Sequence, residues 1–157
     1  MADKKENALK IYVSLPEISP TPWREIEVSL NCTLSDLHYA LQAAFLWEDK
    51  HLWEFLVSRE KRYGPGPSVE EDSSILPAKA TTLQQLVQEG VTELTYIYDF
   101  GDFWVHRIEL KEAFHADDIT SLPRYAGGEY AAPPEDVGGV PGYEYFVNEV
   151  FNNPKSA

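Results

Sequence analysis

Residues 94–110 read LTYIYDFGDFWVHRIEL, two runs rich in β-branched and aromatic residues that meet at Gly101-Asp102. Such runs around a turn with Gly at its first central position are typical of a β-hairpin with a type II′ turn. A turn at Phe100-Gly101 is the alternative, and it keeps the same residues on the same faces. Rings occur on both faces, which predicts a central place in a sheet. In either register one face is expected to carry Thr95, Ile97, Asp99, Asp102, Trp104, His106, Ile108 and Leu110, and the other Leu94, Tyr96, Tyr98, Phe103, Val105 and Arg107.

Three shorter segments before this hairpin also have strand character. Apolar and polar residues alternate over residues 9–15 and again over residues 26–30, which is the period of a half-buried strand. The proline-containing loop between these two segments favours an antiparallel pair. A further strand is predicted over residues 52–57.

Helix signals follow the second strand and recur twice. Thr33 is placed as an N-cap with Asp36 at the third helical position, ahead of an apolar stripe of helical period. A capping box begins at Thr82, and Gly90 is expected to end that short helix. Apolar residues spaced by three and four over residues 143–151 predict a closing helix.

These elements predict one α+β domain over residues 8–152, in the order β-β-α-β-α-β-β-α. We expect a mostly antiparallel or mixed sheet of about five strands, with the helices packed mainly on one face. Residues 59–74 and 121–142 are rich in Gly, Pro and polar residues and are predicted to be loops. Residues 1–7 and 153–157 are expected to be flexible termini.

Composition narrows the possible functions. The 157 residues contain 13 Lys and Arg against 26 Asp and Glu, a net charge of −13. A field of this sign repels polyanions and anionic lipid surfaces, so we expect neither nucleic-acid nor membrane binding. Cys32 is the single cysteine, which excludes an internal disulfide and a cysteine metal cluster. No signal-peptide pattern follows Met1, so a cytoplasmic location is expected.

A site of carboxylates and histidine is the chemistry that these residues support best. Asp99, Asp102, His106, Glu135 and Asp136 are its available ligands. Asp102 and His106 lie four residues apart on one strand, about 13 Å at ~3.3 Å per residue, so they cannot share an ion unless the strand bends. The simpler interpretation, which we favour, is that Asp99 accepts turn amides and Asp102 is solvated.

Two histidines lie on apolar faces. His38 borders the apolar stripe of the first helix, where a histidine satisfied by hydrogen bonds is favoured over a ligand or catalyst. His106 lies between Trp104 and Ile108, which places it either in the core with hydrogen bonds or at the floor of a pocket. The core is the favoured of these two alternatives.

The 99–106 hairpin segment and the 128–139 loop are expected to pack together. The loop adds three acids to the hairpin carboxylates, and its glycines allow close backbone approach. The alternative is that the loop only seals the sheet, with its acids facing water. The candidate binding residues are therefore Asp99, Asp102, Trp104, His106, Glu129, Glu135 and Asp136.

Three blocks of the chain resemble the plasmid pRiA4b ORF-3-like family. The resemblance implies a compact α+β domain of no established activity, found on plasmids, in mobile elements and in bacterial chromosomes. Some relatives carry a resolvase-type label, but a recombinase needs a basic DNA face, so this activity is not expected here. Val137 stands where relatives often have cysteine, and Trp53 replaces a histidine, so no thiol-based metal or redox function is carried over. The blocks run from Trp23-Arg24 through Thr33-Leu34-Ser35-Asp36-Leu37-His38 to His51-Leu52-Trp53-Glu54-Phe55, from Tyr96 to His106, and from Pro133 to Gly139 with Gly142-Tyr143.

The sequence thus favours a non-catalytic binding or interaction module with an unknown protein or small-molecule partner and no cofactor. A metal-assisted hydrolase that uses the carboxylates and histidine is the alternative. Whether the chain catalyses a reaction is left open by the residues.

Overall fold

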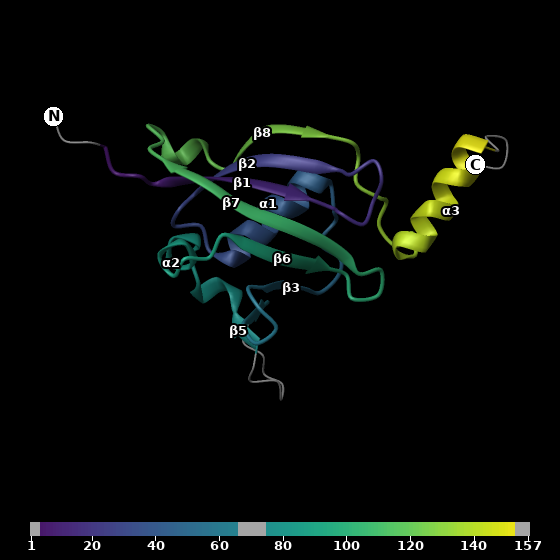
Figure 1. The fold of residues 1–157 in the computed structure, drawn as a ribbon, viewed down its shortest axis with the longest axis horizontal. Helices are drawn as coiled ribbons and strands as arrows, with labels where there is room; N and C mark the ends of the chain where they lie inside the picture. The colour runs from purple at the N-terminus through teal and green to yellow at the C-terminus, as the bar shows by residue number, and fades with distance from the viewer. Residues whose placement is uncertain (1–3, 66–74, 153–157) are drawn as a thin grey trace.

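The computed structural model describes residues 4–65 and 75–152, and these form one sheet of eight strands in the order β5-β4-β3-β6-β7-β1-β2-β8, with three α-helices (Figure 1). Neighbouring strands are antiparallel except β4 and β5, which are parallel. The α+β class and the mixed sheet are therefore confirmed. The strands are β1 (Ala8–Ser14), β2 (Trp23–Ser29), β3 (Trp53–Leu56), β4 (Arg62–Gly64), β5 (Ile75–Pro77), β6 (Glu93–Tyr98), β7 (Trp104–Phe114) and β8 (Arg124–Glu129). The helices are α1 (Leu34–Phe45), α2 (Leu83–Gln88) and α3 (Gly139–Asn152), with 3-10 turns η1 (Ala78–Ala80) and η2 (Ile119–Ser121).

The prediction of about five strands was too low, and the predicted element order was incomplete. The additional strands β4 and β8 come from segments expected to be loops, and β5 lies directly after the first of these segments, where no element was predicted. β8 contains two glycines and is mostly exposed, so no apolar alternation marks it, and backbone pairing with β2 holds it in place. Residues 66–74, within the first predicted loop, lie outside the described residues, as do residues 1–3 and 153–157 of the predicted flexible termini.

The central hairpin forms, but its predicted register was wrong. Tyr98 pairs with Trp104 and Tyr96 with His106, so five residues, not two, connect β6 and β7. Both predicted turns place Tyr98 and Trp104 on opposite faces, whereas the observed pairing places them on the same buried face. The longer connection therefore concentrates the large rings of the hairpin on one side of the sheet.

Asp99 provides the physical reason for the longer turn. Its Oδ1 accepts hydrogen bonds from the backbone amides of Gly101 and Asp102, at 2.9 and 3.2 Å. Asp99 and Phe103 both have left-handed backbones, with φ of 66° and 61°. An Asp side chain that bonds the amides two and three residues ahead stabilises such a turn, and this part of the prediction for Asp99 is confirmed.

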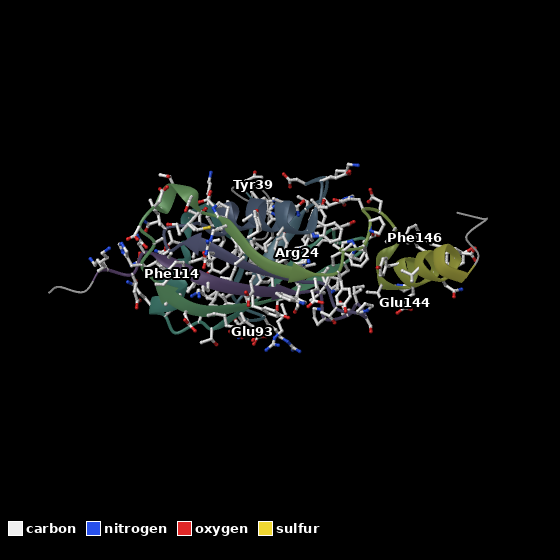
Figure 2. All side chains as sticks on the ribbon, turned by 90° about the horizontal axis from the view of Figure 1, so that it is seen from above. Arg24, Tyr39, Glu93, Phe114, Glu144 and Phe146 are labelled. Carbon is white, nitrogen blue, oxygen red and sulfur yellow. The ribbon has the colours of Figure 1, made fainter. Side chains whose placement is uncertain are left out.

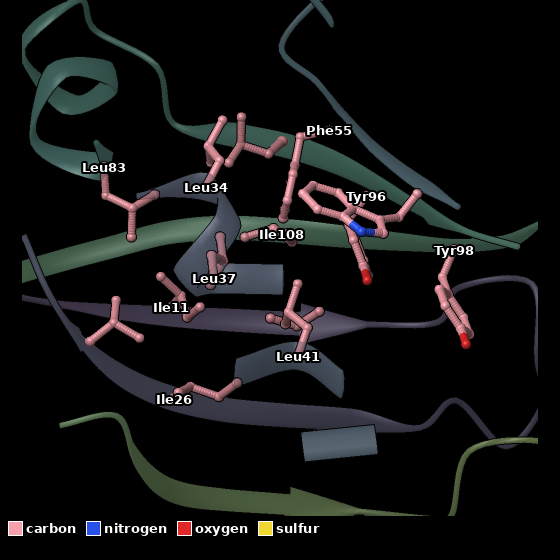
Figure 3. Close-up of a cluster of buried hydrophobic side chains, with 14 of the residues drawn as sticks. Ile11, Ile26, Leu34, Leu37, Leu41, Phe55, Leu83, Tyr96, Tyr98 and Ile108 are labelled. Carbon is pink, nitrogen blue, oxygen red and sulfur yellow. The ribbon is translucent and has the colours of Figure 1, made fainter. Parts of the chain in front are cut away.

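One face of the sheet carries the core. The apolar stripe of α1 points at the buried side chains of β1, β2 and β7, as Figure 3 shows for Leu37 and Leu41 beside Ile11, Ile26 and Ile108. The predicted helix starts are confirmed, because the capping boxes are present at the N-termini of both α1 and α2. The first residues of the two helices are also tied together by backbone hydrogen bonds, which closes one end of the core.

The closing helix behaves differently from the prediction that helices pack mainly on one face. α3 extends beyond the end of the sheet and covers neither face (Figure 1). Charged side chains on β1, β2 and β7 line a hollow of the sheet surface, so that surface offers an apolar helix little to bury. The charged residues lining that hollow are Lys10, Glu25, Glu27, Glu109, Lys111 and Glu112.

No helix within the described residues has the length and apolar run that a bilayer crossing needs.

Candidate metal centre

Four side chains from three separate segments converge near the β6–β7 turn. His51 precedes β3, Asp99 follows β6, and Glu135 and Asp136 lie just before α3. Each offers one ligand atom, and these atoms all lie within 4.8 Å of one another. A separation above about 10 Å would have excluded a shared ion, since ligand–metal distances are only ~2–2.6 Å. We name this group the His51 cluster.

The sheet register brings His51 beside Asp99. β3 pairs with β6 so that Trp53 faces Tyr98, and the amide of Asp99 donates to the carbonyl of Leu52 at 2.9 Å. The residue before Leu52 is thereby placed next to the residue that begins the β6–β7 turn. The position of His51 thus follows from strand pairing.

The loop that leads to His51 is held residue by residue. The amide of Glu48 donates to Glu135 Oε2 at 2.6 Å, and the amide of Lys50 donates to the Tyr98 hydroxyl at 2.9 Å. Between them, the amide of Asp49 donates to the side chain of Gln42 on α1 at 2.7 Å. Consecutive anchors of this kind fix the position of a side chain before any ligand arrives.

Each buried carboxylate of the His51 cluster has one anchored oxygen and one that faces the cluster. Asp99 uses Oδ1 for the turn amides, and its Oδ2 lies 3.5 Å from His51 Nε2. Glu135 uses Oε2 to accept from Glu48 and, at 2.9 Å, from the Tyr98 hydroxyl. Burial raises the pKa of Tyr98, so this phenol keeps its proton and donates it.

Two atoms of the cluster are buried with no hydrogen-bond partner among the described residues, namely Glu135 Oε1 and His51 Nε2. The Nε2 atom lies 2.7 Å from Asp136 Oδ1 and 3.9 Å from Glu135 Oε1, yet neither contact has hydrogen-bond geometry. Buried polar atoms are paired in the great majority of cases, so unpaired ones call for a specific explanation. A bound cation is one such explanation, because it would take both atoms as ligands.

The charge of the His51 cluster is poorly compensated by its surroundings. Within the described part of the chain, no Lys or Arg lies within 4.0 Å of the three carboxylates in an ion pair. Lys50, the neighbouring cation, pairs with Glu48 at 2.5 Å, and Glu48 first, then Asp136 and Glu135, raise the pKa of this ammonium group. Three carboxylates at such distances repel, and a cation offsets that repulsion.

The structure separates the sequence-predicted residues into two groups. Asp99, Glu135 and Asp136 come together as described above. Asp102 lies beside them, where its Oδ2 accepts from the Gly138 amide at 3.2 Å instead of facing the cluster. Glu129 is exposed on β8 opposite Trp23 and lies apart from the group.

Trp104 and His106 belong to the core, not to this group of acids. Both side chains are buried, and Trp104 stacks on Trp47 with ring centroids 5.8 Å apart. His106 accepts from Trp47 Nε1 at 3.1 Å, and its Nδ1 donates to the carbonyls of Tyr96 and Trp104. The core alternative for His106 is thereby confirmed, and Trp104 and His106 are withdrawn as binding candidates because they face away from solvent.

His51 is the residue of the cluster that was not among the candidates predicted from the sequence. It stands in one of the three family blocks, but its neighbours give no periodic signal that selects it. The useful signal is the register of β3 against β6, which sequence alone does not provide. By contrast, the expected packing of the 128–139 loop on the hairpin turn is confirmed by the Gly138–Asp102 and Glu135–Tyr98 hydrogen bonds.

Comparison with known proteins gives a family and a fold but no activity. The chain is 36% identical over 141 residues to the uncharacterized protein y4hQ of Sinorhizobium fredii (strain NBRC 101917 / NGR234), covering 89% of this chain and 71% of that protein. It is also similar to the crystal structure of the protein of unknown function MM3350 from Methanosarcina mazei Go1, with a TM-score of 0.81 and 33% identity over 94% of this chain and 83% of that one. The family model described as plasmid pRiA4b ORF-3-like protein matches residues 7–157. The chain therefore belongs to the plasmid pRiA4b ORF-3-like family.

Proposed function

We propose that this protein is a divalent-cation-binding module whose ion is held by the His51 cluster. The observation that carries the proposal is a pair of buried atoms without a hydrogen-bond partner among the described residues. These atoms, Glu135 Oε1 and His51 Nε2, lie among the carboxylate oxygens of Asp99 and Asp136. The side chains of Asp99 and Glu135 are 7% and 10% exposed, so their free oxygens have little access to water. A bound ion would give both of these carboxylate oxygens a partner.

The donor set indicates which ions to test. One imidazole nitrogen and three carboxylate oxygens make a mixed N/O site, and imidazole favours Zn²⁺ and other first-row ions over Mg²⁺ or Ca²⁺. Zn²⁺ and Mn²⁺ are the two ions that this set fits best, because both accept carboxylate oxygen together with histidine nitrogen.

The outer side of the site is open. The side chain of Asp136 is 55% exposed and that of His51 30%, so an ion held there would keep positions for water or for a group of a ligand. This opening supports a small-molecule or protein partner that binds through the ion. The expectation that nucleic acid is not bound belongs to the same proposal and rests on the net charge of −13. A link to plasmids or mobile elements rests on family resemblance alone.

A metal-assisted hydrolase is the second candidate, and the same opening favours it. An ion with a free position lowers the pKa of bound water and generates a nucleophile. A thiol mechanism has no such support. Burial and, to a smaller extent, the charge of Asp36 raise the pKa of Cys32 to about 12, so its sulfur stays protonated. Turnover of p-nitrophenyl esters or phosphate esters that requires added ion and Asp136 would favour the hydrolase over the binding module.

Calorimetric titration of the chelator-treated protein with Zn²⁺ and with Mn²⁺ tests the proposal. We expect one ion per chain and a loss of affinity of about 10–100-fold or more in His51→Ala. His115→Ala is the matched control, since His115 lies outside the His51 cluster and bonds the carbonyl of Lys5. Equal affinities of wild type, His51→Ala and His115→Ala would overturn the proposed site.

A further inference from the structure

The helix α3 is attached to the domain by the segment that supplies two of the cluster carboxylates. Glu135 and Asp136 lie just before Gly139, the first residue of α3. This segment is clamped on the hairpin turn by the Gly138–Asp102 hydrogen bond. Gly139 has φ of 71° and lies so close to the turn that a Cβ would be 2.8 Å from the Asp102 carbonyl oxygen. The first turn of α3 is therefore in close contact with the β6–β7 turn, which also carries Asp99.

Beyond its base, α3 shares a hollow with the β1–β2 loop, lined by Ile18 and Val147 among others, while part of its surface stays exposed. Val140 and Tyr143 pack against the edge of the core, but Tyr145 is 69% exposed. Figures 1 and 2 show the helix extending away from the sheet, with Phe146 and Phe114 near opposite ends of the molecule. Its 14 residues begin Gly-Val-Pro-Gly. Isolated helices shorter than about 12–15 residues are marginal in water, so the stability of α3 depends on its contacts with the domain, and those at its base are among them.

We propose that cation binding at the His51 cluster fixes the base of α3 and thereby controls its position and helicity. This inference rests on the proposed function. Without the ion, repulsion of Glu135 and Asp136 from Asp99 weakens the hold of the 135–139 segment on the turn. With the ion, the same carboxylates are drawn together, and the segment has to release the ion before it can open.

Linkage gives the size of the effect. If opening of the 135–139 segment releases the ion, the protection of α3 amides from hydrogen exchange rises by the factor 1 + [ion]/Kd. At a free ion concentration of 100 times Kd this is about a 100-fold slowing. If α3 opens without releasing the ion, the factor is one.

Hydrogen exchange with mass spectrometry on the full chain measures this factor directly. We would compare peptides that cover residues 139–150 with saturating Zn²⁺ or Mn²⁺ and with chelator. Residues 115–121 serve as an internal reference, because they follow the far end of β7, about 33 Å along an 11-residue strand from the turn. Slower exchange in α3, with unchanged exchange in the reference, is the expected result.

Calorimetry on the same samples separates this inference from the proposed function. Bound ion with unchanged α3 exchange would overturn the control of α3 and leave the cation site standing. Absence of ion binding would overturn both. Asp136→Asn is expected to lose the slowing, whereas Glu129→Gln, an exposed acid apart from the cluster, is expected to keep it. Ion-dependent slowing that persists in Asp136→Asn at the wild-type magnitude would also overturn the inference.

Discussion

Two polar groups each include a residue of the loop 47–51, and they differ in how many of their buried polar atoms have hydrogen-bond partners. The first, which we name the His38 network, joins His38, Gln42, Asp49 and Tyr96. His38 lies 2.6 Å from the Tyr96 hydroxyl and 2.7 Å from Asp49, while Gln42 bonds both Tyr96 and the Asp49 amide. In the His51 cluster, two buried atoms have no such partner among the described residues.

This difference separates a structural group from a functional one. In the His38 network Gln42 donates to the Tyr96 hydroxyl, which donates to His38 Nδ1, and His38 Nε2 donates to Asp49. Each of these hydrogen bonds joins two protein atoms. Buried polar atoms are paired in the great majority of cases. Arg62 Nε and Trp104 Nε1 are also unpaired among the described residues, but only Glu135 Oε1 and His51 Nε2 lie within a group of converging ligand atoms, so the His51 cluster is where we expect function.

The strongest way to break the comparison is His38→Ala. The variant removes a buried ring that stacks on Trp53 at 4.1 Å and leaves the Tyr96 hydroxyl short of an acceptor. We expect a loss of about 3–5 kcal/mol in the free energy of unfolding. Urea denaturation in chelator measures it. A loss below about 1 kcal/mol would contradict a structural role of this size.

Lowering the pH is expected to destabilise the protein through its buried histidines. Burial lowers the pKa of His106 to about 4, whereas the unfolded chain titrates near its ordinary 6.5. As the pH falls, the unfolded state therefore binds the proton before the folded state does. The contribution of His106 to the free energy of unfolding is fully present above pH 6.5, and about 3 kcal/mol of it is lost as the pH drops toward 4. Burial also lowers the pKa of His38, in the same direction.

The control for this acid effect is His106→Gln, whose amide oxygen can still accept from Trp47 Nε1. We expect its unfolding free energy to depend less steeply on pH between 6.5 and 4 than that of wild type. Denaturation midpoints at half-unit pH steps measure the two slopes. Equal slopes would show that His106 does not couple protonation to folding.

Tyr98→Phe tests whether the residues around the His51 cluster hold its ligands in position. Tyr98 donates to Glu135 and accepts from the Lys50 amide, so it positions one ligand directly and the His51 loop indirectly. Partners of this kind affect metal affinity by about 10–100-fold. We expect a loss of that size in calorimetry, with a loss of stability of about 1–2 kcal/mol.

Tyr63→Phe is a suitable reference for that variant, since Tyr63 is buried on β4 and lies outside the His51 cluster. Its ion affinity should equal that of wild type. If Tyr98→Phe also keeps the wild-type affinity, Tyr98 is only a core residue.

Elements fixed by local chemistry were predictable from the sequence, and elements fixed by long-range pairing were not. The helix starts at Thr33 and Thr82 were found because a capping box lies within four residues. The strand β8 was missed because backbone pairing with β2 defines it. The same limit explains the site: the acids near the turn and in the loop were selected by composition, but His51 depends on the β3–β6 register.

The smallest expected effect is that of Glu135→Gln on stability without ion. The carboxylate contributes anchoring bonds through Oε2, but its buried Oε1 has no partner and its charge repels Asp99 and Asp136. The amide oxygen can still accept the anchoring bonds, and the negative charge is gone. We therefore expect the free energy of unfolding in chelator to change by less than about 1 kcal/mol, toward higher stability. Saturating ion should stabilise wild type and much less so the variant, which reverses their order in a thermal melt. If Glu135→Gln is instead destabilised in chelator as strongly as His38→Ala, Glu135 is a structural residue like those of the His38 network, and the distinction between the two groups is lost.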